Sequence, residues 1–216
     1  MSIFDVLPTF QESPWTYIIV PLIFVSSIIG FYYKPYFYKL VLHPYEVCRG
    51  KRWHTLLTSA FVHRNWWHLL FNLLAIYVLT YDAYECVKQI YGKNVSICLS
   101  PIIYIVLITI PNILQTLRKK ENFLFTTMGA SGLSFGLYGF SGLFFPTETV
   151  SSFVLPFVGN FFFNWLSLLL ILFLLTRVRK TTSQNVYLHL YAFLFGGLLA
   201  FIVRPNSFKE VLSLFI

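Results

Sequence analysis

Four polar side chains lie within otherwise apolar stretches, and together they could carry out acyl transfer. They are Ser131, His189, His68 and Asn72. Serine and histidine form the nucleophile–base pair of acyl transfer, while a second histidine and an amide are suitable donors to an oxyanion. Because His68 and Asn72 are four residues apart, they would share one face of a helix.

Each of these residues also has an ordinary structural interpretation. A lone serine in a membrane helix usually packs and bonds its own backbone, a histidine near a helix end often lies at the interface, and an asparagine can link helices. An unpaired polar group in hydrocarbon is costly, however, so several of them together need partners or a purpose. Their combination favours the chemical interpretation.

The chain that positions these residues is too apolar for a soluble protein. It is 57% hydrophobic and 11% charged, whereas soluble domains average about 25% charged residues. Six stretches are long enough to cross a bilayer, which takes about 20 residues: Thr16–Tyr33, Thr55–Tyr81, Val95–Leu117, Phe123–Phe145, Val150–Thr176 and Val186–Val203. We therefore expect an all-α membrane protein, a six-helix bundle forming one domain over residues 1–216. The stretch between the first two spans could be re-entrant or lie at the interface.

The basic charge of the chain points to lipid rather than to nucleic acid. The net charge is +8, and many basic residues form short clusters between apolar runs, such as Arg118, Lys119 and Lys120. Such clusters anchor helix ends at headgroups or set topology. Three cysteines match no zinc or redox spacing, so neither a metal nor another cofactor is expected.

Six spans would bring the candidate residues to one side of the membrane. The second, fourth and sixth helices all begin at the same face, here called face A. Ser131 would lie about 12 Å into its helix at about 1.5 Å per residue, whereas His189 lies in the first turn of its own. Side-chain reach or a displaced helix boundary must close that difference in depth.

Small residues would let the fourth and sixth helices approach closely. They form stripes on both predicted helices: Gly132, Gly136 and Gly139 on one, and Ala192, Gly196 and Ala200 on the other. Such stripes allow backbones to touch. Close approach is what a serine–histidine hydrogen bond across two helices requires.

The acidic residues favour a catalytic dyad over a triad. None of the eight Asp and Glu residues falls inside the second, fourth or sixth span. A buried carboxylate orienting the histidine, as in soluble serine proteases, is therefore not expected. Phe135 lies one turn deeper than Ser131 on the same face, and its ring could hold the imidazole by stacking.

At these residues the sequence resembles the rhomboid intramembrane proteases. The segment from His63 through His68 to Asn72 is similar to the family pattern H-x4-H-x3-N of the second helix. The segment Gly129-Ala-Ser-Gly132 is similar to the G-x-S-G motif of the fourth helix. His189, followed seven residues later by Gly196, resembles the motif of the sixth helix. The three motifs occur in the expected order within residues 16–203.

The resemblance implies a Ser–His dyad, with Ser131 as nucleophile and His189 as general base and then acid. His68 and Asn72 would donate to the oxyanion, together with backbone N–H groups near the serine, at Gly129 and Ala130. His63 would be structural, in the outer part of the second helix, and Phe135, Gly132 and Gly196 would support the site. The implied substrates are single-span membrane proteins, and the implied location is a multi-pass position in a bacterial or archaeal cell membrane. We expect the entrance beside the fifth span, whose large aromatic residues give a bulky, lipid-facing surface: Phe161, Phe162, Phe163 and Trp165.

Some features depart from the family pattern. The family usually has Trp-Arg in its first loop, whereas here Trp53 is followed by His54 and preceded by Arg52. In the sixth helix Leu188 precedes the histidine and Ala192 stands where the family has glycine. Orientation is also open, because Lys and Arg concentrate at face A, which favours the cytoplasm, while the family would place face A outside.

Two other functions remain as alternatives. The first is a catalytically inactive rhomboid-like factor that binds membrane proteins. The second is a small transporter with a polar path through the bundle. A transporter would be expected to show discontinuous helices or carboxylates within the membrane, and neither is evident in the sequence.

Overall fold

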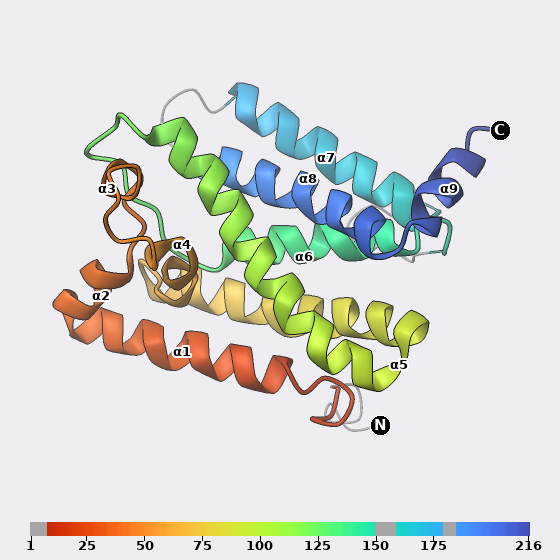
Figure 1. The fold of residues 1–216 in the computed structure, drawn as a ribbon, viewed down its shortest axis with the longest axis horizontal. Helices are drawn as coiled ribbons and strands as arrows, with labels where there is room; N and C mark the ends of the chain where they lie inside the picture. Colours follow the sequence, from red (N-terminus) through yellow and green to blue (C-terminus); the bar gives the residue numbers. More distant parts are fainter. Residues whose placement is uncertain (1–7, 150–158, 179–184) are drawn as a thin grey trace.

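The computed structural model describes residues 8–149, 159–178 and 185–216. The described residues are mostly helical and contain no β-strand. Figure 1 shows the helices: α1 (Thr16–Tyr32), α2 (Lys34–Leu40), α3 (Pro44–Val47), α4 (Thr55–Thr58), α5 (Trp66–Lys119), α6 (Ser131–Phe144), α7 (Phe161–Val178), α8 (Val186–Val203) and α9 (Asn206–Ser213). A 3-10 turn, Ser59–Phe61, follows α4.

Helix α5 consists of two segments that fold back on each other. Gly92 interrupts the helix with φ 77° and ψ 169°, a conformation that glycine adopts readily. The chain reverses direction there (Figure 1). The two segments correspond to the second and third spans expected from the sequence.

Length and composition mark two helices as candidate membrane spans, α5 and α8. Helix α1 and most of α7 (Phe161–Arg177) are apolar but shorter. The expectation of a helical protein with long apolar segments is therefore confirmed for the described residues.

Three helices, α5, α6 and α7, begin later than expected, and the structure shows a cause for the first two. Helix α5 begins at Trp66 rather than near Thr55, because the Asn65 side chain caps it by accepting the His68 N–H at 2.9 Å. Helix α6 begins at Ser131 rather than at Phe123. The preceding segment is instead held in an extended bridge, in which Thr127 and Leu42 exchange two backbone hydrogen bonds of 3.0 Å.

The bounds of the last two expected spans agree with the structure to different extents. Helix α8 has the predicted bounds, Val186–Val203. Helix α7 begins at Phe161 rather than at Val150, and residues 150–158 lie outside the described part of the chain. The short helix α9 was not expected from the sequence.

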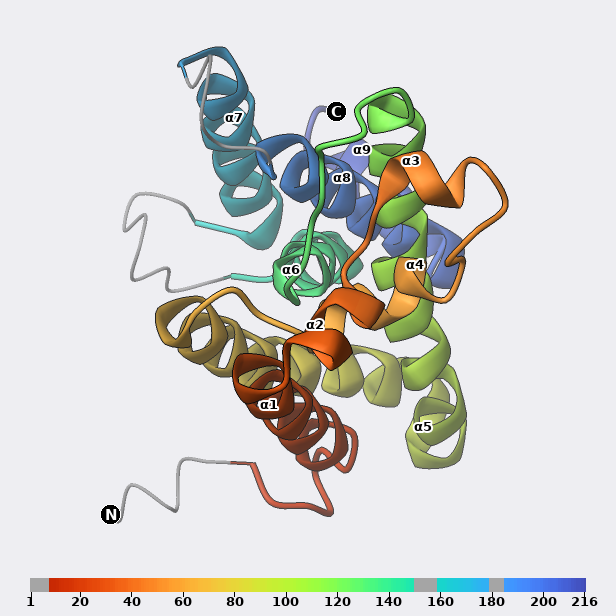
Figure 2. The same cartoon turned by 90° about the vertical axis from the view of Figure 1, so that its left-hand side faces the viewer.

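Helix α6 forms the centre of the molecule. Figure 2 shows it nearly end-on, with α5, α7 and α8 around it. Its closest neighbour is α8, because a Cβ atom added at Gly139 would overlap the Phe193 carbonyl, and one added at Gly196 would overlap the Gly136 carbonyl. The small-residue stripes thus bring the two backbones into direct contact.

The segment between α1 and α5 forms a compact cap of short helices at one end of the molecule (Figure 1). Arg52 ties it together by donating to Glu46 at 3.0 Å, to the Val41 carbonyl at 2.8 Å and to the Tyr38 carbonyl. The hydrogen bond from Arg52 lowers the pKa of the Glu46 carboxyl. The arginine that precedes Trp53 therefore holds the cap.

Candidate active site

Ser131 and His189 meet across the α6–α8 contact. The distance from Ser131 Oγ to His189 Nε2 is 2.9 Å, within hydrogen-bonding range. Ser131 is the first residue of α6 instead of lying two turns into a longer helix, and His189 lies in the first turn of α8. The later start of α6 therefore removes the difference in depth that the sequence left unresolved.

An aromatic ring holds the histidine in place. The Phe135 ring stacks on the His189 imidazole, with centroids 4.4 Å apart and planes inclined by 18°. Among the described residues, no carboxylate is hydrogen-bonded to His189. For Nε2 to accept the Ser131 proton, the ring must carry its own hydrogen on Nδ1.

The pair opens into a cavity of about 370 Å³. The cavity brings together all four polar residues singled out in the sequence, and it is otherwise lined mainly by apolar side chains. Its walls are His68, Phe71, Asn72, Ala75, Leu79, Ser131, Ser134, Phe135, Tyr138, Leu168 and His189. Helices α5, α6, α7 and α8 all contribute to it.

His68 and Asn72 share one face of α5 and both face this cavity. Asn72 donates one amide hydrogen to the His68 carbonyl at 2.7 Å, which leaves its second N–H available. The His68 imidazole lies against the backbone of Gly129, where an added Cβ atom would overlap the ring. Only glycine leaves room for His68 here, and the φ of 106° at Gly129 also favours glycine.

The backbone donors differ from those expected. The Gly129 N–H bonds to the Ser59 carbonyl at 2.9 Å, and the Ala130 N–H bonds to His63 Nε2 at 3.1 Å. Both groups therefore have hydrogen-bond partners in this structure, and their role as oxyanion donors stays a prediction. In the described part of the chain, the N–H of Ser131 makes no hydrogen bond. As the first N–H of α6, it is the backbone donor available to an anion.

His63 holds the segment before Ser131 against α1. Its ring is buried and lies ahead of α5 rather than on that helix. Because Nε2 accepts from Ala130, Nδ1 carries the hydrogen and donates it to Ser27 Oγ at 2.8 Å. Ser27 in turn donates to the Phe61 carbonyl at 3.0 Å.

Ser27 has a part in the site that the sequence reasoning missed. The adjacent serines at positions 26 and 27 of an apolar span were the signal that could have identified it.

The surface of α7 differs in part from the expected lipid-facing one. Phe163 is exposed, but Phe162 is buried. Trp165 stacks on Phe193 of α8 with centroids 5.0 Å apart. Leu168, one turn further along, faces the cavity. Helix α7 therefore presents a mixed face, of which one side packs on α6 and α8.

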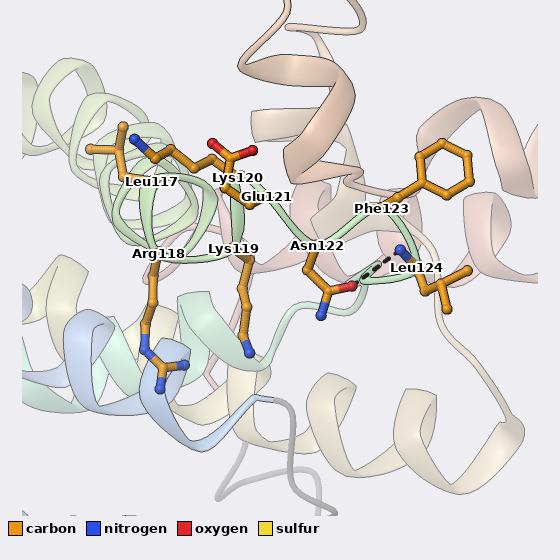
Figure 3. Close-up of a pocket in the computed structure, with 8 residues that line it drawn as sticks. All are labelled: Leu117, Arg118, Lys119, Lys120, Glu121, Asn122, Phe123 and Leu124. Atoms are coloured by element: carbon orange, nitrogen blue, oxygen red, sulfur yellow. Dashed lines mark hydrogen bonds between the residues drawn. The ribbon is translucent and has the colours of Figure 1, made fainter.

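A larger cavity, of about 610 Å³, surrounds the end of α5 and is formed by residues 117–124 (Figure 3). Three of its lining residues are basic, Arg118, Lys119 and Lys120. Arg118 reaches from it to stack on the Tyr187 ring, 3.4 Å from the centroid. This cavity is therefore mainly basic and lies at the helix end.

Fold and cavity together define a helical protein with a serine–histidine pair at the meeting point of two closely packed apolar helices. The family model described as the Rhomboid domain matches residues 50–206. The chain therefore belongs to the rhomboid family, as its motifs predicted, and the proteins of this family are embedded in membranes. No curated protein matches the chain.

Proposed function

We propose that the protein is an intramembrane serine protease that hydrolyses peptide bonds in or near the transmembrane segments of other membrane proteins. The observation that carries the proposal is the 2.9 Å contact between Ser131 Oγ and His189 Nε2 inside a partly apolar cavity. Membership of the rhomboid family supports the same activity class. An inactive relative has no need of this pair.

The mechanism begins with attack of Ser131 Oγ on the scissile carbonyl while His189 Nε2 accepts the serine proton. The resulting oxyanion receives hydrogen bonds from the Ser131 N–H and from the side chains of His68 and Asn72. His189 then gives its proton to the leaving amine, and water, activated by the same base, hydrolyses the acyl-enzyme.

Phe135 takes over two roles that the carboxylate has in a catalytic triad, orienting the histidine and stabilising its positive charge. When His189 gains a proton, the imidazolium lies over the face of an aromatic ring, which attracts cations. The same stacking fixes the ring plane so that Nε2 points at the serine. The dyad thus obtains orientation and some charge stabilisation without a buried carboxylate.

Six helical segments are proposed to be membrane spans of one domain, with both termini on one side. They are α1, the two segments of α5, α6, α7 and α8. The dyad and the cap between α1 and α5 would then lie toward face A. Water would reach the cavity from that face, and a substrate would enter from the lipid between α5 and α7.

The proposed substrates are single-span membrane proteins with a weak helix near the cut. A transmembrane helix hides its carbonyl groups in internal hydrogen bonds. Gly or Pro close to the scissile bond would lower the cost of exposing that bond. Strongly helical spans without such residues are expected to be cleaved more slowly.

The decisive experiment reconstitutes the protein with a single-span substrate and compares the wild type with Ser131→Ala. The wild type should cleave the substrate and react with a fluorophosphonate probe, and the variant should do neither. Normal cleavage by Ser131→Ala would refute the proposal. Binding of the substrate by the wild type with neither cleavage nor labelling would identify a rhomboid-like binding factor instead.

A further inference from the structure

A second cavity adjoins the first, further along α6. Its volume is about 200 Å³, and it shares the lining residues Leu79 and Tyr138 with the cavity around the dyad. Helices α5, α6 and α7 form its walls, with Leu79, Asp82, Tyr138, Ser141, Gly142, Phe161 and Asn164. The two cavities therefore follow one another along the same side of α6.

The second cavity is rich in groups that accept hydrogen bonds. Among the described residues, the Asp82 carboxylate has neither a hydrogen bond nor an ion pair. Ser141 Oγ is buried without a hydrogen-bond partner. The Tyr138 hydroxyl accepts from the Asn164 amide at 2.6 Å. A carboxylate beside hydroxyl oxygens is suited to a cationic group with several N–H donors.

The position of this cavity suits a residue at the edge of a membrane span. Ser141 is ten residues beyond Ser131 on α6, which corresponds to about 15 Å along the helix axis. Helix α6 ends at Phe144, so the cavity lies toward the opposite end of α6 from the dyad. Lys and Arg commonly flank transmembrane segments at such levels.

We propose that the Asp82 cavity is a second substrate subsite, which binds a Lys or Arg side chain of the transmembrane substrate. This inference rests on the proposed protease function. A substrate lying along α6 would place there a residue about ten positions from the scissile bond if helical, or about five if extended. The subsite would thus select the position of the cut relative to a basic residue.

The ammonium group of a lipid headgroup is a second cation with the chemistry that this cavity would bind. The shared lining residues favour the substrate, because a chain that reaches Ser131 through the gap between α5 and α7 passes Leu79 and Tyr138 on the way to Asp82. In the experiment below, the lipid composition of the vesicles distinguishes a substrate side chain from a lipid headgroup as the group that binds.

The test uses single-span substrates that carry either Lys or Gln, scanned over the five to ten positions on the membrane side of the cut. The full-length protein is reconstituted in phosphatidylglycerol vesicles, which contain no cationic headgroup. At the best position, the wild type should show a Lys-to-Gln ratio of kcat/KM of about ten, typical of one partly buried charge pair. The ratio should fall to about one for Asp82→Asn.

Two further variants sharpen the experiment. Glu85→Gln is the matched control, because Glu85 lies one turn away on α5 and pairs with Lys88 at 2.6 Å instead of lining the cavity. Its Lys-to-Gln ratio should equal that of the wild type. Asp82→Lys should reverse the selectivity and favour a substrate with Glu at the same position.

The possible outcomes distinguish failure of the subsite from failure of the protease proposal. A wild-type ratio of one at every position overturns the subsite, whereas a wild type that cleaves none of the substrates overturns the protease proposal itself. An effect of Asp82→Asn that is equal for Lys and Gln substrates, and seen only in phosphatidylethanolamine vesicles, assigns the cavity to lipid and also overturns the subsite. Fluorophosphonate labelling of Ser131 reports whether the Asp82→Asn variant is folded. If this variant does not fold, the Lys-to-Gln ratio of kcat/KM of the wild type alone decides whether the subsite exists.

Discussion

The His189 imidazole lies nearly parallel to the Phe135 ring, with centroids 4.4 Å apart. Phe135 stands one turn after Ser131 on α6, so the helix that carries the proposed nucleophile also orients the proposed base. The arrangement links the two proposed catalytic roles through one helix. A change at Phe135 should therefore affect the reaction without displacing the serine.

Phe135→Leu should lower kcat about tenfold, because it removes the aromatic face that attracts the imidazolium and fixes its plane. Phe135→Tyr preserves the ring and should retain most of the activity, which makes it the matched control. The measurement is the pH profile of kcat for both variants beside the wild type. Equal losses for Leu and Tyr would mean that stacking is not the cause.

His63→Ala should destabilise the fold, because it leaves the Ala130 N–H buried without a partner and removes one of the two hydrogen bonds of Ser27, which keeps its bond to the Phe61 carbonyl. The expected loss is about 2–3 kcal/mol of unfolding free energy, measured as a lower Tm in detergent. His54→Ala is the control, since His54 is exposed and bonds only the Lys39 carbonyl at 3.0 Å. An unchanged Tm for His63→Ala would rule out the structural role.

Gly196→Ala should separate α6 from α8. The added methyl group would overlap the backbone of Gly136 and Phe140, which cannot move aside as a side chain can. Overpacking of this kind costs about 1–3 kcal/mol, and it should also reduce fluorophosphonate labelling by pulling Ser131 away from His189.

Gly132→Ala provides the contrast on the same interface. Its new Cβ atom would meet the Leu188 side chain at 3.9 Å, an ordinary van der Waals distance. Its Tm should stay close to that of the wild type. A larger loss for Gly132→Ala than for Gly196→Ala would contradict the packing argument.

The sequence predicted those helices and helix contacts that depend on the type and spacing of nearby residues. Helix α8 has the expected bounds, and the Ser131–His189 contact follows from motifs and small-residue stripes that can be read without coordinates. Long apolar runs and stripes of small residues are patterns of residues close together in the sequence, so they can be recognised without a structure.

The start of α6 depended on a contact that no local pattern shows. The segment before Ser131 is apolar enough to continue a helix, but it pairs with Leu42, which is far away in the sequence. The Gly129 and Ala130 N–H groups likewise bond to residues that are distant in the sequence, Ser59 and His63. Tertiary hydrogen bonds thus overrode the hydropathy pattern, and among the described residues they leave the Ser131 N–H, not those of Gly129 and Ala130, without a partner.

The last prediction concerns the oxyanion donors. His68→Ala and Asn72→Ala should each lower kcat by about 10²–10³-fold, because each removes a donor aimed at charge that develops only in the transition state. KM should change little, since the neutral carbonyl of the bound substrate depends less on these donors.

Asn65→Ala is the matched control for these two variants. Asn65 caps α5 through the His68 N–H at 2.9 Å and does not line the cavity. Losing the cap should cost about 1 kcal/mol of stability and leave kcat nearly unchanged. Single-turnover cleavage and Tm, measured for all three variants, separate the two effects. If His68→Ala or Asn72→Ala lowers Tm as Asn65→Ala does but spares kcat, that side chain has a structural role. The Ser131 N–H would then be the principal donor to the oxyanion.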